Sequence, residues 1–269
     1  MLVRTGLAAI AVLCLAGTAI AGGASARPSE TWEFIREATF PDATIADAEG
    51  MIEIDAPVRA QDAAIVPVSL RVRPTEGRRV ERLTLIVEEN PAPIAAEFAF
   101  GERMGRDVAL STRLRVNAYS NVRVVAELDD GALIEAARFV KASGGCAAPA
   151  TKDPDAAAAR LGRMKLRRFA DAGPAAGMDE AQVMVRHPNN SGFQVDQVSL
   201  LTIPAFFVDR MEVSLDGERL FAMTGGISLS EDPSFRFAYP AVDDGTFEVV
   251  AGDNEGGVYR DSFPVGQGS

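Results

Sequence analysis

Apolar and polar residues alternate along most of the chain between about residues 52 and 141. The alternation is clearest at 64–72, 82–87, 108–116, 122–128 and 133–140. A period of two places every second side chain on the same face of a β-strand. Asp129-Asp130-Gly131 separates the last two segments, and Asp-Gly is a frequent pair in tight hairpin turns. This part of the chain therefore predicts an antiparallel, immunoglobulin-like β-sandwich.

A second series of short strand patterns begins at Met164 and continues almost to the C-terminus. The expected strands are 182–187, 195–203, 211–215, 219–223, 235–239, 246–251 and 258–263. Asp216-Gly217 and Asp244-Gly245 mark turns between them, and Pro204 ends one of the patterns. No strand alternates with a long helical pattern, so a parallel sheet is not expected. The second half predicts another immunoglobulin-like sandwich.

Helical spacing is found near the start of the strand-rich region. Ser29 is placed to cap a helix that has Trp32, Ile35 and Ala38 on one face and ends near Phe40-Pro41. The predicted fold class is all-β, with two antiparallel sandwiches in one chain and a short N-terminal helix.

The segment between the two strand series has a different composition. Residues 141–150 are Lys-Ala-Ser-Gly-Gly-Cys-Ala-Ala-Pro-Ala, with no large apolar side chain. Such a sequence adds nothing to a core and is typical of a linker. We therefore expect a first sandwich over 27–143, an arm and linker over 144–160, and a second sandwich over 161–269.

Residues 1–26 have the features of a Sec-type secretory signal peptide. Arg4 is their only charge, an apolar run follows, and Ala24-Ser25-Ala26 supplies the small residues of a cleavage site. The apolar run is too short for a stable transmembrane helix. We expect cleavage after Ala26 and export of the mature chain to the periplasm.

Composition then excludes several classes of function. The 269 residues carry a formal charge of −11, which disfavours binding to nucleic-acid phosphates. One His and two Cys are too few for a His-rich metal site, a four-cysteine zinc site or a disulfide framework. No carboxylate pair or cofactor motif has a telling spacing. We expect no enzymatic activity, no catalytic residues, no metal and no cofactor.

Cys146 is the residue on which the functional interpretation depends. Removal of the signal peptide removes Cys14 and leaves Cys146 as a single thiol in an oxidising compartment. One interpretation is a buried structural cysteine. Gly144 and Gly145 before it, and Ala147-Ala148-Pro149 after it, favour instead an exposed, functional thiol on a mobile arm.

His187 is the second candidate. It could form a dyad with Cys146, or a copper-delivery set with Cys146 and methionines. No third orienting group is identifiable from the spacing. We therefore interpret His187 as a structural residue that orders the Pro188-Asn189 turn, and the scattered methionines as packing residues.

Several landmarks together resemble the SoxY and SoxZ families of sulfur-carrier proteins. The SoxY-like stretches are Trp32 with Ile35 and Phe40-Pro41-Asp42, 54–57, Asn90-Pro91, 113–117 and the Lys-Ala-Ser-Gly-Gly-Cys motif at 141–146. The SoxZ-like stretches are 164–166, the His-Pro-Asn-Asn-Ser-Gly motif at 187–192, 203–208 and 227–235. The whole chain looks most similar to fused SoxYZ-like carriers associated with quinoprotein dehydrogenases.

The resemblance implies a periplasmic carrier in sulfur oxidation, including thiosulfate oxidation. Cys146 would hold the sulfur intermediate covalently, on an arm formed by Gly144 and Gly145, and present it to periplasmic sulfur-oxidising enzymes. One feature departs from the family: in the separate carrier subunit the motif ends the chain, whereas here the arm is tethered on both sides. The alternative is an accessory or assembly module for a periplasmic quinoprotein dehydrogenase that does not depend on the thiol. Neither function involves nucleic acid, nor a membrane after signal removal.

Overall fold

The computed structural model describes residues 26–269 apart from 76, 150–156 and 267–269. The signal-peptide prediction falls almost wholly outside the described residues. The elements given for the described residues are, in chain order, α1 (Glu30–Thr39), β1 (Ile45–Asp47), β2 (Ile52–Asp55), β3 (Val66–Val72), β4 (Val80–Val87), β5 (Ile94–Phe100), the 3₁₀ turn η1 (Glu102–Met104), β6 (Val108–Leu114), β7 (Ser120–Leu128), β8 (Leu133–Val140), β9 (Met164–Phe169), β10 (Met178–Val185), β11 (Val208–Leu215), β12 (Glu218–Gly225), β13 (Ser234–Pro240), β14 (Thr246–Asp253) and β15 (Val258–Pro264). Within the described part, no helix is long and apolar enough to cross a bilayer.

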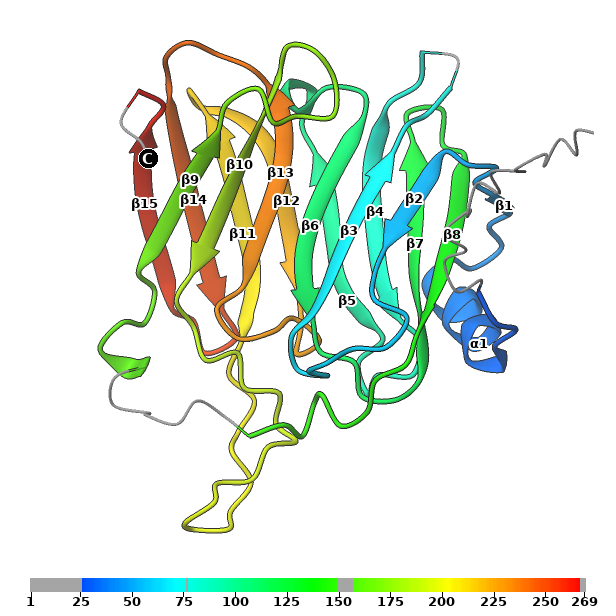
Figure 1. The fold of residues 1–269 in the computed structure, drawn as a ribbon, viewed down its shortest axis with the longest axis vertical. Coiled ribbons are helices and arrows are strands. Elements are labelled where there is room, and N and C mark those ends of the chain that lie inside the picture. Colours follow the sequence, from blue (N-terminus) through cyan, green and yellow to red (C-terminus); the bar gives the residue numbers. More distant parts are fainter. Residues whose placement is uncertain (1–25, 76, 150–156, 267–269) are drawn as a thin grey trace, which may run out of the picture.

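The strands form two stacked sheets (Figure 1). One sheet has the order β1-β8-β7-β4-β5-β12-β11-β14-β15, and the other has the order β2-β3-β6-β13-β10-β9. All pairings between strands are antiparallel except that of β1 with β8. The predicted all-β class with one short N-terminal helix is confirmed.

Alternating burial places one face of each sheet against the other. In β10, for example, every second residue from Asp179 to Val185 is buried. The sandwich formed by β1–β8 and the one formed by β9–β15 lie side by side, and both sheets continue across the junction through β5–β12 and β6–β13. Phe98 of β5 packs against Phe221 of β12 and Phe235 of β13, with ring centroids 6.0 and 5.7 Å apart. One apolar core therefore runs through both halves.

The N-terminal helix forms where the sequence predicts it. The Ser29 hydroxyl accepts a hydrogen bond from the Trp32 backbone N–H at 3.1 Å, which caps the first turn. Trp32 and Ile35 pack on Ile86 of β4 and Val125 of β7, on the outer face of the larger sheet. Ala38 was expected on the same face but is exposed.

Residues 195–203 do not form the expected strand. Between β10 and β11 the chain leaves the sheets, and its only β contacts there are the isolated bridges Asn190–Phe206 and Val195–Thr202. The side chain of Asp196 accepts hydrogen bonds from the backbone of Val198 and Ser199, which folds the segment into a turn. We call residues 190–206 the finger; it projects below both sheets in Figure 1.

Candidate functional site

The residues that the sequence singled out meet at one end of the sandwich. Cys146 follows β8 and lies in a short turn beneath the strands. The loops after β4 and β6, the loop before β13 and the base of the finger approach the same place. We call residues 144–146 the Gly-Gly-Cys segment.

The two glycines are required for different reasons. Gly144 has φ +79°, a left-handed conformation that residues with a side chain rarely adopt, but it has open space around it. Gly145 is enclosed: a Cβ there would lie 2.1 Å from the Ala63 carbonyl oxygen and 2.7 Å from that of Val116. The amide of Gly144 donates to the Asn117 carbonyl at 2.8 Å, and the amide of Gly145 donates to the Val116 carbonyl at 3.1 Å. The segment therefore docks closely against the loop after β6.

Cys146 is buried in this arrangement. Only 1% of its surface is exposed, and it is a free thiol. Neither apolar cluster of the described residues includes it. The expectation of an exposed thiol on a mobile arm is thus wrong for this conformation, because polar loops from both halves of the chain cover the segment. Burial raises the pKa of the Cys146 thiol, and the positive charge of Arg115 offsets part of that rise.

Arg115 connects the Gly-Gly-Cys segment to the second half of the chain. Its Nη1 donates to the Gly145 carbonyl and its Nη2 to the Asn189 carbonyl, both at 3.2 Å. Its Nε has no hydrogen-bond partner within the described structure. The guanidinium is buried, and the loss of hydration lowers its pKa. A buried cation held by two carbonyls fixes the position of the peptide that precedes Cys146.

The serine of the His-Pro-Asn-Asn-Ser-Gly motif makes the other contact to the cysteine. The Ser191 hydroxyl donates to the Cys146 carbonyl oxygen and accepts from the Phe193 amide. The Ser191 amide in turn donates to Oε1 of the buried Gln194 at 3.0 Å. The base of the finger therefore holds the backbone of Cys146.

Asn90 braces the loop on which the segment rests. Its Nδ2 donates to the Arg115 carbonyl at 2.7 Å and to the Ser228 hydroxyl at 2.9 Å. Its Oδ1 accepts from the Asn117 amide at 2.8 Å. Asn90 and Ser228 belong to different sandwiches, so this bracing depends on their side-by-side packing.

His187 is a structural residue, as expected. Its Nδ1 accepts from the Asn189 amide at 3.1 Å, which orders the turn that follows. The ring packs on Phe206 with centroids 4.3 Å apart, and Nε2 lies 3.8 Å from Asp253. Burial lowers the pKa of His187, and the charge of Asp253 opposes this.

The described residues contain no group of three or more His, Cys, Asp or Glu side chains placed to hold a metal ion. Two of the scattered methionines, Met211 and Met223, lie in the apolar core.

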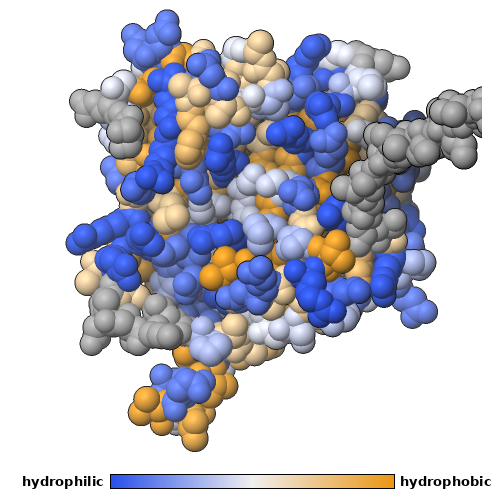
Figure 2. Space-filling view, in the orientation of Figure 1, coloured by the Kyte–Doolittle hydropathy of each residue, from blue (hydrophilic) through white to orange (hydrophobic). Residues whose placement is uncertain are grey.

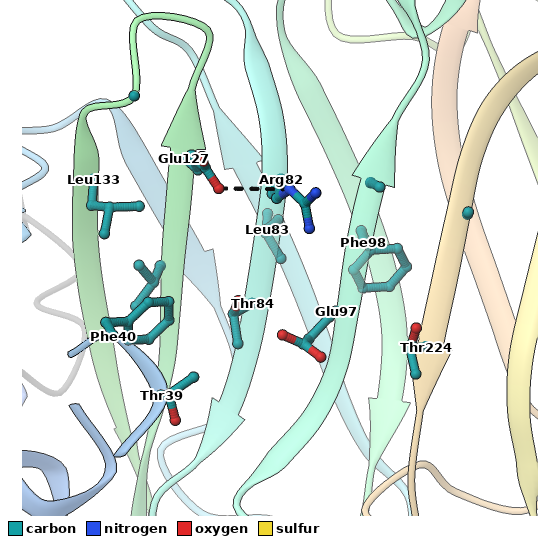
Figure 3. A pocket seen from close by; sticks show the side chains of 14 residues that line it. Thr39, Phe40, Arg82, Leu83, Thr84, Glu97, Phe98, Glu127, Leu133 and Thr224 are labelled. Atoms are coloured by element: carbon teal, nitrogen blue, oxygen red, sulfur yellow. Dashed lines mark ion pairs between the residues drawn. The ribbon is translucent and has the colours of Figure 1, made fainter. Parts of the chain in front are cut away.

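A separate hollow of about 410 Å³ lies on the outer face of the larger sheet (Figure 3). Thr84, Glu97 and Thr224 line its floor, and Arg82 pairs with Glu127 at 3.7 Å beside it. It contains no residue of the Gly-Gly-Cys segment or of the loops that cover it. The candidate site is therefore the Cys146 region.

Sequence reasoning assigned no role to Arg115, Asn90 or Ser191. Each of these residues lies in a stretch that carries the family resemblance. The alternating pattern over 108–116, however, predicts that Arg115 points away from the core. Its burial follows from the finger and the Gly-Gly-Cys segment, which are remote in sequence.

Comparison with known proteins identifies both halves of the chain. The family model "Sulfur oxidation protein SoxY" matches residues 36–146, and "Sulphur oxidation protein SoxZ" matches residues 168–264. The first match ends at Cys146. Comparison with curated protein sequences gives no match.

Two solved structures resemble the chain in part. The sulfur carrier protein SoxY from Chlorobium limicola f thiosulfatophilum is 27% identical, covers 42% of this chain and 91% of its own, and has a TM-score of 0.34. The superoxide reductase (neelaredoxin) from Ignicoccus hospitalis is 16% identical, covers 40% of this chain and 90% of its own, and has a TM-score of 0.29. Both TM-scores lie below the range in which an overlay establishes a shared fold. The two family matches show that the chain contains a SoxY domain followed by a SoxZ domain. These are the two domains of the SoxYZ family of sulfur carriers, a family of non-catalytic proteins to which this chain belongs.

Proposed function

We propose that this protein carries sulfur intermediates covalently on the thiol of Cys146 and presents them to periplasmic Sox sulfur-oxidising enzymes. The observation that carries the proposal is the setting of Cys146. It is the last residue of the SoxY match, it follows two glycines, and it is buried where hydrogen-bonded loops meet, without belonging to the large cluster that forms the apolar core. A cysteine with only a packing role would be expected within that core.

The polar contacts of the Gly-Gly-Cys segment suit a carrier that alternates between a sheltered and a presented thiol. The docked thiol is shielded and largely protonated, which protects it from oxidation. Hydrogen bonds rather than packed apolar side chains hold the segment, so release costs a few contacts and leaves the core intact. Gly144 and Gly145 then provide the backbone freedom for presentation.

Loading of the thiol is an oxidation. When Cys146 joins the terminal sulfur of thiosulfate, an S–S bond forms, the thiol loses its proton, and two electrons leave. The same balance holds for sulfide, with a second proton released. A partner enzyme accepts the electrons, and the carrier contributes the thiolate and its position.

The test is the intact mass of the protein isolated from its native periplasm, before and after treatment with a reductant. The expected result is a sulfur adduct on Cys146 that the reductant removes, and no adduct on Cys146→Ser. A Cys146 that stays unmodified, even after incubation with thiosulfate and Sox enzymes, contradicts the proposal. If Cys146→Ser also retained full activity in the cell, the thiol-independent accessory role in a quinoprotein dehydrogenase system would be favoured instead.

We also propose how the chain is divided into an export signal, two sandwiches and a linker. A signal peptide over 1–26 directs export, a SoxY-like sandwich spans 27–143, an arm and linker span 144–160, and a SoxZ-like sandwich spans 161–269. N-terminal sequencing of the periplasmic protein should begin at Arg27.

A further inference from the structure

The tip of the finger exposes large apolar side chains. Val198, Leu200 and Leu201 are 93%, 74% and 69% exposed, and Phe193 and Val195 lie exposed along the sides. The tip stands out as an apolar patch at the lower end of the molecule in Figure 2. Clustered exposure of this kind is costly in water and marks interaction surfaces.

The tip is also built to keep these side chains in place. Asp196 caps the turn through its side chain, its amide donates to the Leu201 carbonyl, and its carbonyl accepts from the Leu200 amide, both at 2.9 Å. Leu200 has φ +58°, where glycine or asparagine would be less strained. The turn therefore retains a large apolar side chain at a position where the local backbone disfavours one.

The base of the finger holds Cys146. Ser191 donates to the Cys146 carbonyl, and Asn190 pairs with Phe206 across the two sides of the finger. A protein that binds the tip therefore holds the same loop whose base is hydrogen-bonded to Cys146.

The charge and size of the tip limit what it can bind. Residues 190–206 contain no Lys or Arg, and Asp196 is their only charged residue, so the finger does not suit an anionic membrane surface. A few side chains expose far less than the roughly 800 Å² that each partner contributes to a stable complex. A small apolar anchor instead suits a transient contact, in which a few side chains carry most of the binding energy.

We propose that the finger is the docking element for the enzyme that loads or processes sulfur on Cys146, with Val198, Leu200 and Leu201 entering an apolar groove beside that enzyme's active site. This inference rests on the proposed carrier function and adds to it the surface that recognises the partner.

The test compares the parent chain with a variant that carries Val198→Ser, Leu200→Asn and Leu201→Ser. These side chains are exposed, and asparagine tolerates the backbone of residue 200, so the fold should be retained. The matched control is Phe34→Ser, which removes an apolar side chain that is 75% exposed on α1, at the far side of the sandwich. Two rates are measured by intact mass: loading of Cys146 from thiosulfate by purified Sox enzymes, and alkylation of Cys146 by iodoacetamide.

The expected result is at least a tenfold fall in kcat/KM for enzymatic loading of the finger variant, mainly through KM. Alkylation of that variant should be unchanged, and Phe34→Ser should match the parent in both assays. Unchanged enzymatic loading, or a fall in both rates, overturns the docking role and leaves the carrier function standing. A parent that dimerises through the tip, with a monomeric variant in light scattering, also overturns it. A parent that is never loaded overturns both proposals.

Discussion

Gly145→Ala tests whether the docked position of Cys146 governs its reactivity. The added Cβ would lie 2.1 Å from the Ala63 carbonyl oxygen, and both this oxygen and that of Val116 belong to backbone that cannot move aside easily. Gly145 and Cys146 must therefore leave their site, while the hydrogen bond from Gly144 to Asn117 can remain. Docking then loses three hydrogen bonds: Gly145 to Val116, Arg115 to Gly145 and Ser191 to Cys146. At about 1 kcal/mol each, the docked state loses about 3 kcal/mol, which corresponds to an approximately 100-fold increase in the exposed population.

The assay is the rate at which iodoacetamide alkylates Cys146 at neutral pH, followed by intact mass. Gly145→Ala should react about 100-fold faster than the parent. Because the docked native state loses about 3 kcal/mol, its melting temperature should also fall by about 6–12 °C. Gly144→Ala is the matched control. It meets only the strain of φ +79° in open space, costs about 1 kcal/mol and should accelerate alkylation about fivefold. If Gly145→Ala reacts no faster than Gly144→Ala, the clash does not control exposure of the thiol and the reasoning is refuted.

Three further predictions concern the surroundings of the segment. Burial raises the pKa of Cys146 in the docked state, so docking favours the protonated thiol. Docking is therefore at full strength below the pKa of the free thiol, about 8.5, and is lost as pH rises from there through the raised pKa of the docked thiol. Alkylation of the parent should accordingly become steeply faster above about pH 8.5. A rate that depends on pH as in unfolded protein would contradict this. Asn90→Ala removes two buried hydrogen bonds and one that is partly buried. It should lower the unfolding free energy by about 3 kcal/mol and the melting temperature by about 6–12 °C in calorimetry. A shift below about 2 °C would show that water replaces these hydrogen bonds. The pKa of His187 is lowered in the folded protein, so neutral His187 stabilises the fold above about pH 6.5 and this contribution is lost as pH falls. In urea titrations, the difference in unfolding free energy between the parent and His187→Asn should therefore narrow between about pH 7 and 5. A constant difference would mean that the protonation of His187 does not change on unfolding.

Most of the strands could be predicted because their signal is local. Residues 108–114 and 133–140 alternate along their own length and form β6 and β8. The helix at α1 was equally accessible, since Ser29 and its first turn are adjacent in sequence. The prediction of a strand at 195–203 is wrong because apolar residues in a short run need not be buried. In the finger those side chains face solvent, and within the described residues no neighbouring strand completes a sheet there.

The chemistry of the site was only partly accessible. A cysteine that follows two glycines, in a stretch without large apolar residues, can be identified from residue types alone. The environment of that thiol could not be predicted from residue types. The Gly-Gly-Cys segment is surrounded by three separate loops, which contribute Ala63, Arg115 and Ser191. Composition suggested exposure, whereas Cys146 is buried where these loops meet.

The sequence by itself determined the all-β class and the position of Cys146 after two glycines, since these follow from residue type and short-range periodicity. Only the tertiary structure decided that the two sandwiches share both sheets, that the thiol is buried, and that the base of the apolar finger contacts Cys146. These features arise from contacts between residues remote in the chain, such as β5 with β12 and Ser191 with Cys146. Local patterns specify which face of a strand is apolar, but they do not specify which distant segment will cover it.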